Sequence, residues 1–185
     1  MRVLVTGFEP WGDVPRNPTQ ELVEGLDESG VVGLVLPVSF ERAGRILRRA
    51  IAEERPDAIL GLGLAPRSAW VRVEVLAVNV MHSEKPDADG ARPVSERIDP
   101  EGPAAYFTTL PNAEIVGALR SAGVPARLSH HAGTFLCNFA AYTSLRQVDV
   151  LGLGSVAGFI HVPYSTEAAM EVGEEVPSLP RRSLE

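Results

Sequence analysis

Residues 40–62 read FERAGRILRRAIAEERPDAILGL and join an amphipathic segment to a short apolar run. In the first part, apolar side chains recur every three or four residues with Arg and Glu between them, which predicts an α-helix with one buried face. The run at 57–62 is typical of a strand that is buried on both sides. Since another apolar run at 31–37 precedes the helix, residues 31–62 are expected to form a β-α-β unit.

The same alternation continues toward both ends of the chain. Further strands are expected at 2–6, 71–80, 126–129 and 157–161, and further helices at 18–27, 112–122 and 137–145. With 185 residues, 45% of them hydrophobic, the chain can bury one core but is too short for two ordinary domains. We therefore expect a single α/β domain over residues 1–185: a three-layer α/β/α sandwich around a twisted, mostly parallel mixed sheet.

Composition limits the partners of the protein and its location. A formal net charge of −7 provides no basic surface of the kind that binds nucleic acid. No segment is long and apolar enough for a signal peptide or a membrane helix, and a single cysteine cannot form an internal disulfide. We expect a reduced, cytoplasmic protein without a nucleic-acid or membrane partner.

Residues 81–104 contain several prolines and an Asp-Gly pair, and no periodic pattern. Such a segment predicts a long irregular excursion from the fold. In a compact domain, an excursion of this length usually serves as a lid or as a contact between subunits.

In a mostly parallel sheet, ligands bind beyond the carboxyl ends of the strands. Three segments occupy such positions: 7–12, 130–137 and 161–164. Cys137 lies at the expected start of a helix, where partial positive charge favours a thiolate and unpaired N–H groups can bind an oxyanion. Taken alone, Cys137 is equally well explained as an inert buried thiol.

His161 ends an apolar strand, and Glu74 lies inside another. The histidine could be a hydrogen-bonded core residue, and the glutamate could form a structural ion pair with Arg72 or Arg67, because a buried charge requires a partner. Together with Cys137, however, they supply a nucleophile, a base and an orienting acid. These three groups are the minimum for acyl transfer by a thiol.

Residue spacing disfavours two other chemistries. The GLG triplets at 61–63 and 152–154 resemble part of a dinucleotide-binding pattern, but neither precedes an expected helix, and we interpret them as turn glycines. A zinc site lacks the usual paired-ligand spacing among its candidates His130, His131, Cys137 and His161. We expect neither a cofactor nor a metal.

Several longer motifs occur along the chain. They are VLVTGFEPWG (3–12), NPT (17–19), GLAP (63–66), EVLAVN (74–79), PAAYFTTLP (103–111), AGTFLCN (132–138) and GFIHVPY (158–164). In sequence and in order, these motifs resemble the pyroglutamyl peptidase type I, or pyrrolidone carboxyl peptidase, family. The resemblance covers nearly the whole chain.

The resemblance implies a cysteine exopeptidase with Cys137 as nucleophile, His161 as general base and Glu74 as orienting acid. Its substrates would be peptides with an N-terminal pyroglutamyl (5-oxoprolyl) residue, hydrolysed through a thioester acyl-enzyme without a cofactor. Phe8 and Trp11 would line the slot for the lactam ring. The family also implies a homo-oligomer, either a dimer or a tetramer, with contacts from residues 81–104.

The chain departs from the family pattern near Glu74. Val75 stands where Arg is common, and Arg67-Ser68 replaces a Gly-Arg pair, so different contacts are expected around Glu74. The chain also stops near the point where relatives continue into a closing helix, and a short C-terminus is expected. Two alternatives therefore remain open: a thiol amidase of the same fold with another acyl specificity, and a non-catalytic relative that binds a small molecule.

Overall fold

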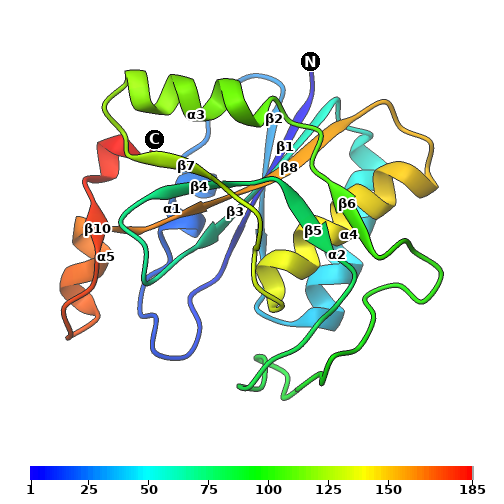
Figure 1. The fold of residues 1–185 in the computed structure, drawn as a ribbon, viewed down its shortest axis with the longest axis horizontal. Coiled ribbons are helices and arrows are strands. Elements are labelled where there is room, and N and C mark those ends of the chain that lie inside the picture. Colours follow the sequence, from blue (N-terminus) through cyan, green and yellow to red (C-terminus); the bar gives the residue numbers. More distant parts are fainter. Residues whose placement is uncertain (185) are drawn as a thin grey trace.

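A computed structural model describes residues 1–184, which form a central six-stranded sheet in the order β2-β1-β3-β8-β4-β7. The strands are β1 (Val3–Phe8), β2 (Val31–Leu36), β3 (Ala58–Leu64), β4 (Val71–Glu74), β7 (Ala126–Ser129) and β8 (Val156–Val162). All neighbours are parallel except β4 and β8, which run antiparallel. The expected fold class, with its mostly parallel mixed sheet, is confirmed (Figure 1).

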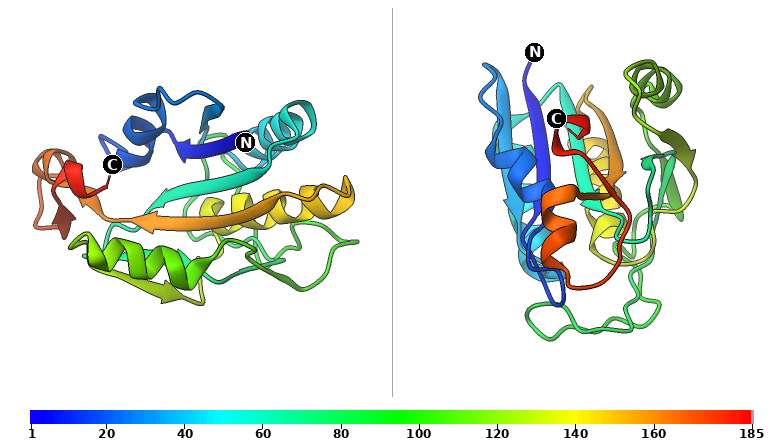
Figure 2. Two further views of the ribbon diagram at one scale, coloured as in Figure 1. Left: turned by 90° about the horizontal axis from the view of Figure 1, so that it is seen from above. Right: turned by 90° about the vertical axis from the view of Figure 1, so that its left-hand side faces the viewer.

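Helices cover both faces of the sheet. On one face α2 (Phe40–Glu54) and α4 (Leu136–Val150) pack side by side, and on the other lie α1 (Pro18–Glu24) and α3 (Asn112–Ser121) (Figure 2). Beyond β8 the chain forms β9 (Tyr164–Ser165), α5 (Thr166–Glu171), β10 (Ser178–Leu179) and a 3₁₀ turn at Arg181–Ser183, which sequence reasoning did not anticipate. None of the helices described is both long enough and apolar enough to cross a bilayer.

Alternation along the strands divides the apolar core into two clusters. Leu4, Ile59 and Phe159 point toward α2 and α4, whereas Val5 and Ile160 point toward α1 and α3. Because side chains alternate between the faces of a strand, a residue's position along its strand decides which helix layer it meets. Glu74 and His161 lie on the same face as Phe159, because Glu74 pairs with Phe159, and His161 is two residues further along β8.

The expectation of a single strand at 71–80 is wrong, because the chain leaves the central sheet after Glu74. The hydroxyl of Thr108 donates to the Glu74 carbonyl at 2.8 Å, and its N–H donates to the Val75 carbonyl at 2.9 Å. These bonds use carbonyls near the end of β4 and turn the chain into β5 (Leu76–Val78), which pairs with β6 (Ala105–Phe107) in a separate two-stranded sheet.

Residues 81–104 are irregular, as expected, and project away from the sheet (Figures 1 and 2). The base of this excursion is fixed by the buried side chain of Asn79. Its Oδ1 accepts from the N–H groups of Ile98 and Asp99, both at 2.9 Å, and its Nδ2 donates to the Asp99 carbonyl at 2.7 Å. The segment therefore leaves and rejoins the fold at one anchored point.

Candidate active site

Cys137, the second residue of α4, lies over β3 where that strand reaches its carboxyl end. A Cβ atom added to Gly63 would lie 2.7 Å from the Cys137 Sγ, and one added to Gly61 would lie 2.4 Å from the Phe159 ring. Both glycines are inside β3, so their interpretation as turn glycines is wrong. They are small because the thiol and the aromatic ring occupy the space where their side chains would be.

The N-terminus of α4 is left without a side-chain cap. Phe135 stands at the N-cap position, and the first turn contains no acidic residue. The first N–H groups of a helix have no intrahelical acceptor, and among residues 1–184 no other group accepts from the N–H groups of Leu136, Cys137 or Asn138. These donors and the helix dipole favour negative charge beside the thiol.

Asn138 fixes this helix start in place, a role that sequence reasoning missed. Its side chain is buried and forms three hydrogen bonds of 2.9 Å with β5 and the residues after it. Nδ2 donates to the carbonyls of Val78 and Val80, and Oδ1 accepts from the Val78 N–H. The only sequence signal was an Asn directly after the cysteine, which can be read as an ordinary helix residue.

His161 and Glu74 form a buried hydrogen-bonded pair on neighbouring strands. The His161 Nδ1 lies 2.8 Å from the Glu74 Oε1, and both side chains are less than 5% exposed. Since an ionised carboxylate can only accept, Nδ1 carries the proton, which leaves Nε2 for Cys137. His161 is the register partner of Gly63, the residue under the Cys137 Sγ. The structure thus brings together the three residues singled out in the sequence.

Electrostatics in this cluster favour an imidazolium. Burial alone would lower the pKa of His161, but charge on Cys137 and hydrogen bonds to Cys137 and Glu74 raise that pKa to about 9. Burial, the largest single influence, would raise the pKa of Glu74, yet hydrogen bonds from His161 and Ser129 and the charges of His161 and Arg72 together outweigh it, and the carboxyl pKa is lowered. Each group therefore holds its neighbour in the charged form.

Arg72 is the other charged neighbour of Glu74. Its Nε lies 3.7 Å from the Glu74 Oε1, and it comes two residues earlier on the same face of β4. This distance is too long for a hydrogen bond, and the Arg72 Nε has no hydrogen-bond partner within the described residues. The interpretation of Glu74 as an ion-pair residue is thus secondary to its shorter contact with His161.

Phe8 and Trp11 lie in different settings. Phe8 is the last residue of β1, is only 4% exposed, and was wrongly expected to lie in a loop after that strand. Trp11 is half-buried, and its ring centroid lies 5.5 Å from that of Phe135, an aromatic neighbour that sequence reasoning missed. Phe135, two residues before Cys137, connects this aromatic pair to the start of α4.

The remaining candidates of the zinc set do not converge on Cys137. His130 and His131 are exposed, and the His131 Nδ1 accepts from the Gly133 N–H at 2.8 Å. No group of three or more metal-ligating side chains occurs in the described part of the chain.

A cavity of about 540 Å³ lies on the opposite face of the sheet, between α1 and α3. Its floor consists of apolar side chains of β1, β3, β4 and β8, including Val5, Leu62 and Ile160. Neither Cys137 nor Glu74 nor His161 borders it. The cavity is thus separate from the cluster of Cys137, His161 and Glu74 on the face with α4.

A thiol held against a buried imidazole–carboxylate pair is the arrangement that thiol-dependent acyl-transfer enzymes use, here on an α/β sheet. The family within that class follows from comparison with known proteins. The chain belongs to the pyroglutamyl peptidase family, whose model matches residues 1–184. The family resemblance of its motifs is therefore confirmed.

Curated relatives and solved structures agree with this assignment. The chain is 45% identical over 175 residues to a pyrrolidone-carboxylate peptidase of Thermococcus kodakarensis, covering 92% of this chain and 85% of the relative. It is 40% identical over 187 residues to that of Pyrococcus furiosus, covering 97% and 90%. The solved pyrrolidone carboxyl peptidase of Thermococcus litoralis superposes with a TM-score of 0.94 at 38% identity, covering 99% of this chain and 87% of that chain.

Proposed function

We propose that this protein is a cysteine exopeptidase that hydrolyses the bond after an N-terminal pyroglutamyl residue. Membership of the pyroglutamyl peptidase family supports the activity. The observation that carries the residue roles is the buried 2.8 Å bond between the His161 Nδ1 and the Glu74 Oε1, with the Cys137 thiol on the other side of the imidazole.

In the proposed reaction the thiol proton has already passed to His161, as its raised pKa favours, and the Cys137 Sγ bonds as a thiolate to the pyroglutamyl carbonyl carbon. The carbonyl electron pair moves to the oxygen, where the free N–H groups at the start of α4 stabilise it. Collapse of this intermediate expels the amine of the shortened peptide, which takes its proton from His161. Water, deprotonated by His161, then cleaves the thioester and restores the thiol. Glu74 orients the ring throughout and stabilises its positive charge.

The acyl slot is proposed to lie toward β1, with Phe8 and Trp11 against the lactam ring. The contact between Trp11 and Phe135 supports this location, because it places a flat aromatic surface two residues from the nucleophile. A ring without a free amine must be recognised by flat apolar contacts and a few hydrogen bonds. Phe8 would contribute from the end of β1 beneath this surface.

The activity is tested with a chromogenic pyroglutamyl amide and enzyme whose thiol has been titrated. We expect a burst of product equal to the thiol concentration if acylation is faster than deacylation, and turnover in either case. The matched control is the prolyl amide, which lacks the ring carbonyl. No cleavage of the pyroglutamyl amide would leave a non-catalytic relative as the explanation, and equal cleavage of the prolyl amide would indicate another acyl specificity.

The ring wall is tested by replacing Phe8. Phe8→Ala should lower kcat/KM for pyroglutamyl substrates by roughly 10- to 200-fold, the usual effect of lost apolar contacts in a specificity pocket. Because Phe8 is buried, Phe8→Leu serves as a second variant that keeps the core filled but removes the flat ring. Phe107→Ala, at an exposed phenylalanine of β6, is the control.

Alkylation of Cys137 by iodoacetamide should be unchanged in both Phe8 variants, and circular dichroism checks that the fold survives. Wild-type activity in these variants, or alkylation that falls in parallel with activity, would remove Phe8 from the proposed slot.

We further propose that the described chain acts as one peptidase domain in the cytoplasm and assembles into a dimer or tetramer. A single cysteine with no disulfide partner is consistent with a reducing compartment. Within the excursion at 81–104, Val94 is 68% exposed and provides an apolar contact for a second copy. Light scattering should report a multiple of the 19.8 kDa chain, and Val94→Glu should shift it toward the monomer. A wild-type monomer would contradict the assembly.

A further inference from the structure

Three arginines gather beside the catalytic histidine. A cavity of about 220 Å³ is lined by Ala65, Pro66, Arg67, Ser68, Arg72 and Arg127. Arg127 pairs in register with Arg72 on the next strand, and Arg72 pairs with His161 on the other side. Residues opposite each other on neighbouring strands share a face, so Arg127, Arg72 and His161 form a row on the face that carries Cys137.

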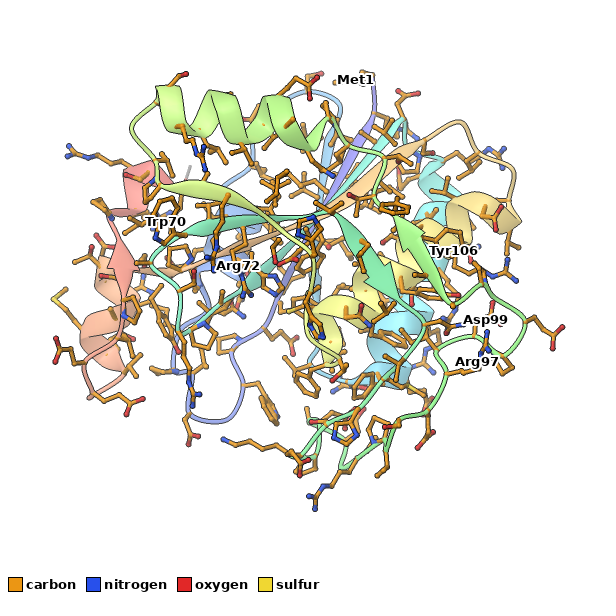
Figure 3. All side chains as sticks on the ribbon, in the orientation of Figure 1. Met1, Trp70, Arg72, Arg97, Asp99 and Tyr106 are labelled. Atoms are coloured by element: carbon orange, nitrogen blue, oxygen red, sulfur yellow. The ribbon has the colours of Figure 1, made fainter. Side chains whose placement is uncertain are left out.

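The cavity begins next to the catalytic site. Ala65, the first residue after β3, donates its N–H to the Val162 carbonyl at 2.8 Å, one residue from His161. The hydroxyl of Ser68 bonds both to the N–H and to the carbonyl of Trp70, which holds this loop in a fixed turn. Figure 3 shows Arg72 beside β4 near the middle of the molecule, inward from Trp70.

The positive charge of this cluster is not compensated by the protein. Within residues 1–184 the side chains of Arg67 and Arg127 have no hydrogen bond or ion pair, and the buried Nε of Arg72 has no hydrogen-bond partner. The sole acidic contact is that of Arg72 with Glu74 at 3.7 Å, and Glu74 already binds His161. In a chain of net charge −7, three cations that converge on one cavity form a site for an anion.

The orientation of the substrate at the active site decides which part of it reaches this cavity. The acyl group lies on the side of β1, and His161 must reach the leaving nitrogen to protonate it. The peptide after the scissile bond therefore continues past His161 toward β4 and β7. Strands lie about 4.8 Å apart, and an extended residue spans about 3.5 Å, so a carboxylate one or two residues beyond the bond reaches Arg72 and Arg127.

We propose that the arginine cavity is a subsite for a carboxylate on the leaving peptide, either its C-terminus in a pyroglutamyl dipeptide or an acidic side chain next to the scissile bond. This inference rests on the proposed peptidase activity and adds a preference on the departing side of the substrate. Arg67, Arg72 and Arg127 are specificity-determining residues here, since they contact the substrate away from the reacting atoms.

Two matched peptide pairs test the subsite and distinguish the sources of the carboxylate. Pyroglutamyl-alanine is compared with pyroglutamyl-alanine amide, and pyroglutamyl-glutamate amide is compared with pyroglutamyl-glutamine amide. Wild-type kcat/KM should favour the carboxylate member of at least one pair by about 3- to 20-fold, because partly exposed charge contacts are individually modest. The preference should weaken as ionic strength rises.

Arg127→Gln and the double variant Arg67→Gln/Arg127→Gln should bring that ratio toward 1. Arg72 is left intact because it also contacts Glu74. The ratio is taken within one preparation, so a partial loss of active enzyme cancels. Arg48→Gln, which removes an exposed charge from α2, should keep the wild-type ratio.

Equal rates within both pairs in the wild type, or a preference that survives in the double variant, would overturn the subsite while leaving the peptidase activity in place. Failure to cleave any of the four peptides would overturn the proposed function and the subsite together.

Discussion

The two helices on the face of the sheet that carries Cys137, α2 and α4, each contain 15 residues and pack against each other, but their N-termini differ. At α2 the Ser39 Oγ accepts from the Arg42 N–H at 3.1 Å, and a carboxylate oxygen of Asp87 accepts from the Phe40 N–H at 2.9 Å. Glu41 adds an acid in the first turn. The start of α4 has no capping side chain and no acidic residue in its first turn, and its second residue is Cys137.

We infer that the start of α2 is purely structural, whereas the start of α4 keeps its N–H groups free for the oxyanion of the proposed reaction. A capping side chain typically contributes about 1 kcal/mol of stability, and α4 lacks this contribution. Donors left free in the folded protein need no rearrangement when an oxyanion forms against them. The start of α4 is instead held by the side chain of Asn138, which bonds to Val78 and Val80 without using these N–H groups.

The largest expected effect follows from replacing Glu74, which is proposed to help activate the Cys137 thiol through His161. Glu74→Gln should lower kcat by about 10²- to 10⁴-fold, because the amide fills the same space but cannot stabilise an imidazolium. Cys137 in the wild type should react with iodoacetamide near neutral pH faster than a free thiol does, and the variant should lose this advantage. Glu53→Gln, an exposed acid of α2, is the control. Unchanged turnover would reduce Glu74 to a structural ion-pair residue.

The charged pair of His161 and Glu74 beside the start of α4 also predicts a pH dependence of activity. No such pair lies at the start of α2 among the residues that the structure describes. With a His161 pKa of about 9, raised from 6.5, the ring stays protonated up to about pH 9 and can donate to the leaving amine. Above that pH, kcat/KM should fall roughly tenfold per unit. Glu74→Gln removes one cause of the raised pKa, so its alkaline limb should begin at lower pH. An alkaline limb at the same pH in both proteins would contradict the assignment.

Adding a cap to α4 tests directly whether its free N–H groups take part in the reaction. Phe135→Ser places a hydroxyl at the N-cap, where it can accept from the N–H of Cys137 or Asn138 and compete with the oxyanion. Phe135→Ala loses the same aromatic packing without adding a cap. We expect kcat of the Ser variant to be about 3- to 10-fold below that of the Ala variant, with somewhat higher stability. Equal kcat values would mean that these N–H groups do not take part in the reaction.

Removing the cap from α2 is the reciprocal change and should have the smallest effect. Ser39→Ala should lower the free energy of unfolding by about 1 kcal/mol, measured in urea, while kcat stays at the wild-type value. Ser121→Ala at the exposed end of α3 is a control with no cap to lose. A large loss of activity in Ser39→Ala would show that the two helix starts are not separate in function.

Local patterns predicted most of this architecture, because hydrophobic periodicity is a property of neighbouring residues. The helix at 40–54 and the strands around 31–36 and 58–64 follow directly from it. The break after Glu74 was missed, because it depends on Thr108, more than thirty residues away. Strand pairing of this kind is invisible to periodicity.

The site shows the same division. Cys137, His161 and Glu74 were identified by residue type and position, and by family resemblance, and the structure brings them together. The parts that were missed act through contacts between distant segments. Asn138 bonds across to β5. Arg72 becomes part of the proposed anion subsite only because Arg127 and His161 flank it on neighbouring strands.

Gly63 has a consequence for how this protein tolerates change. A methyl group there would meet both the Cys137 Sγ and the ring of Phe159 within 3 Å, and the thiol is the group that could most easily rotate away. Glycine has no side chain that could take part in the chemistry. A saturation mutagenesis survey scored by growth on a pyroglutamyl nutrient would nevertheless rank position 63 alongside Cys137, the proposed nucleophile. Readers of such a map should then attribute its intolerance to volume and not to reactivity.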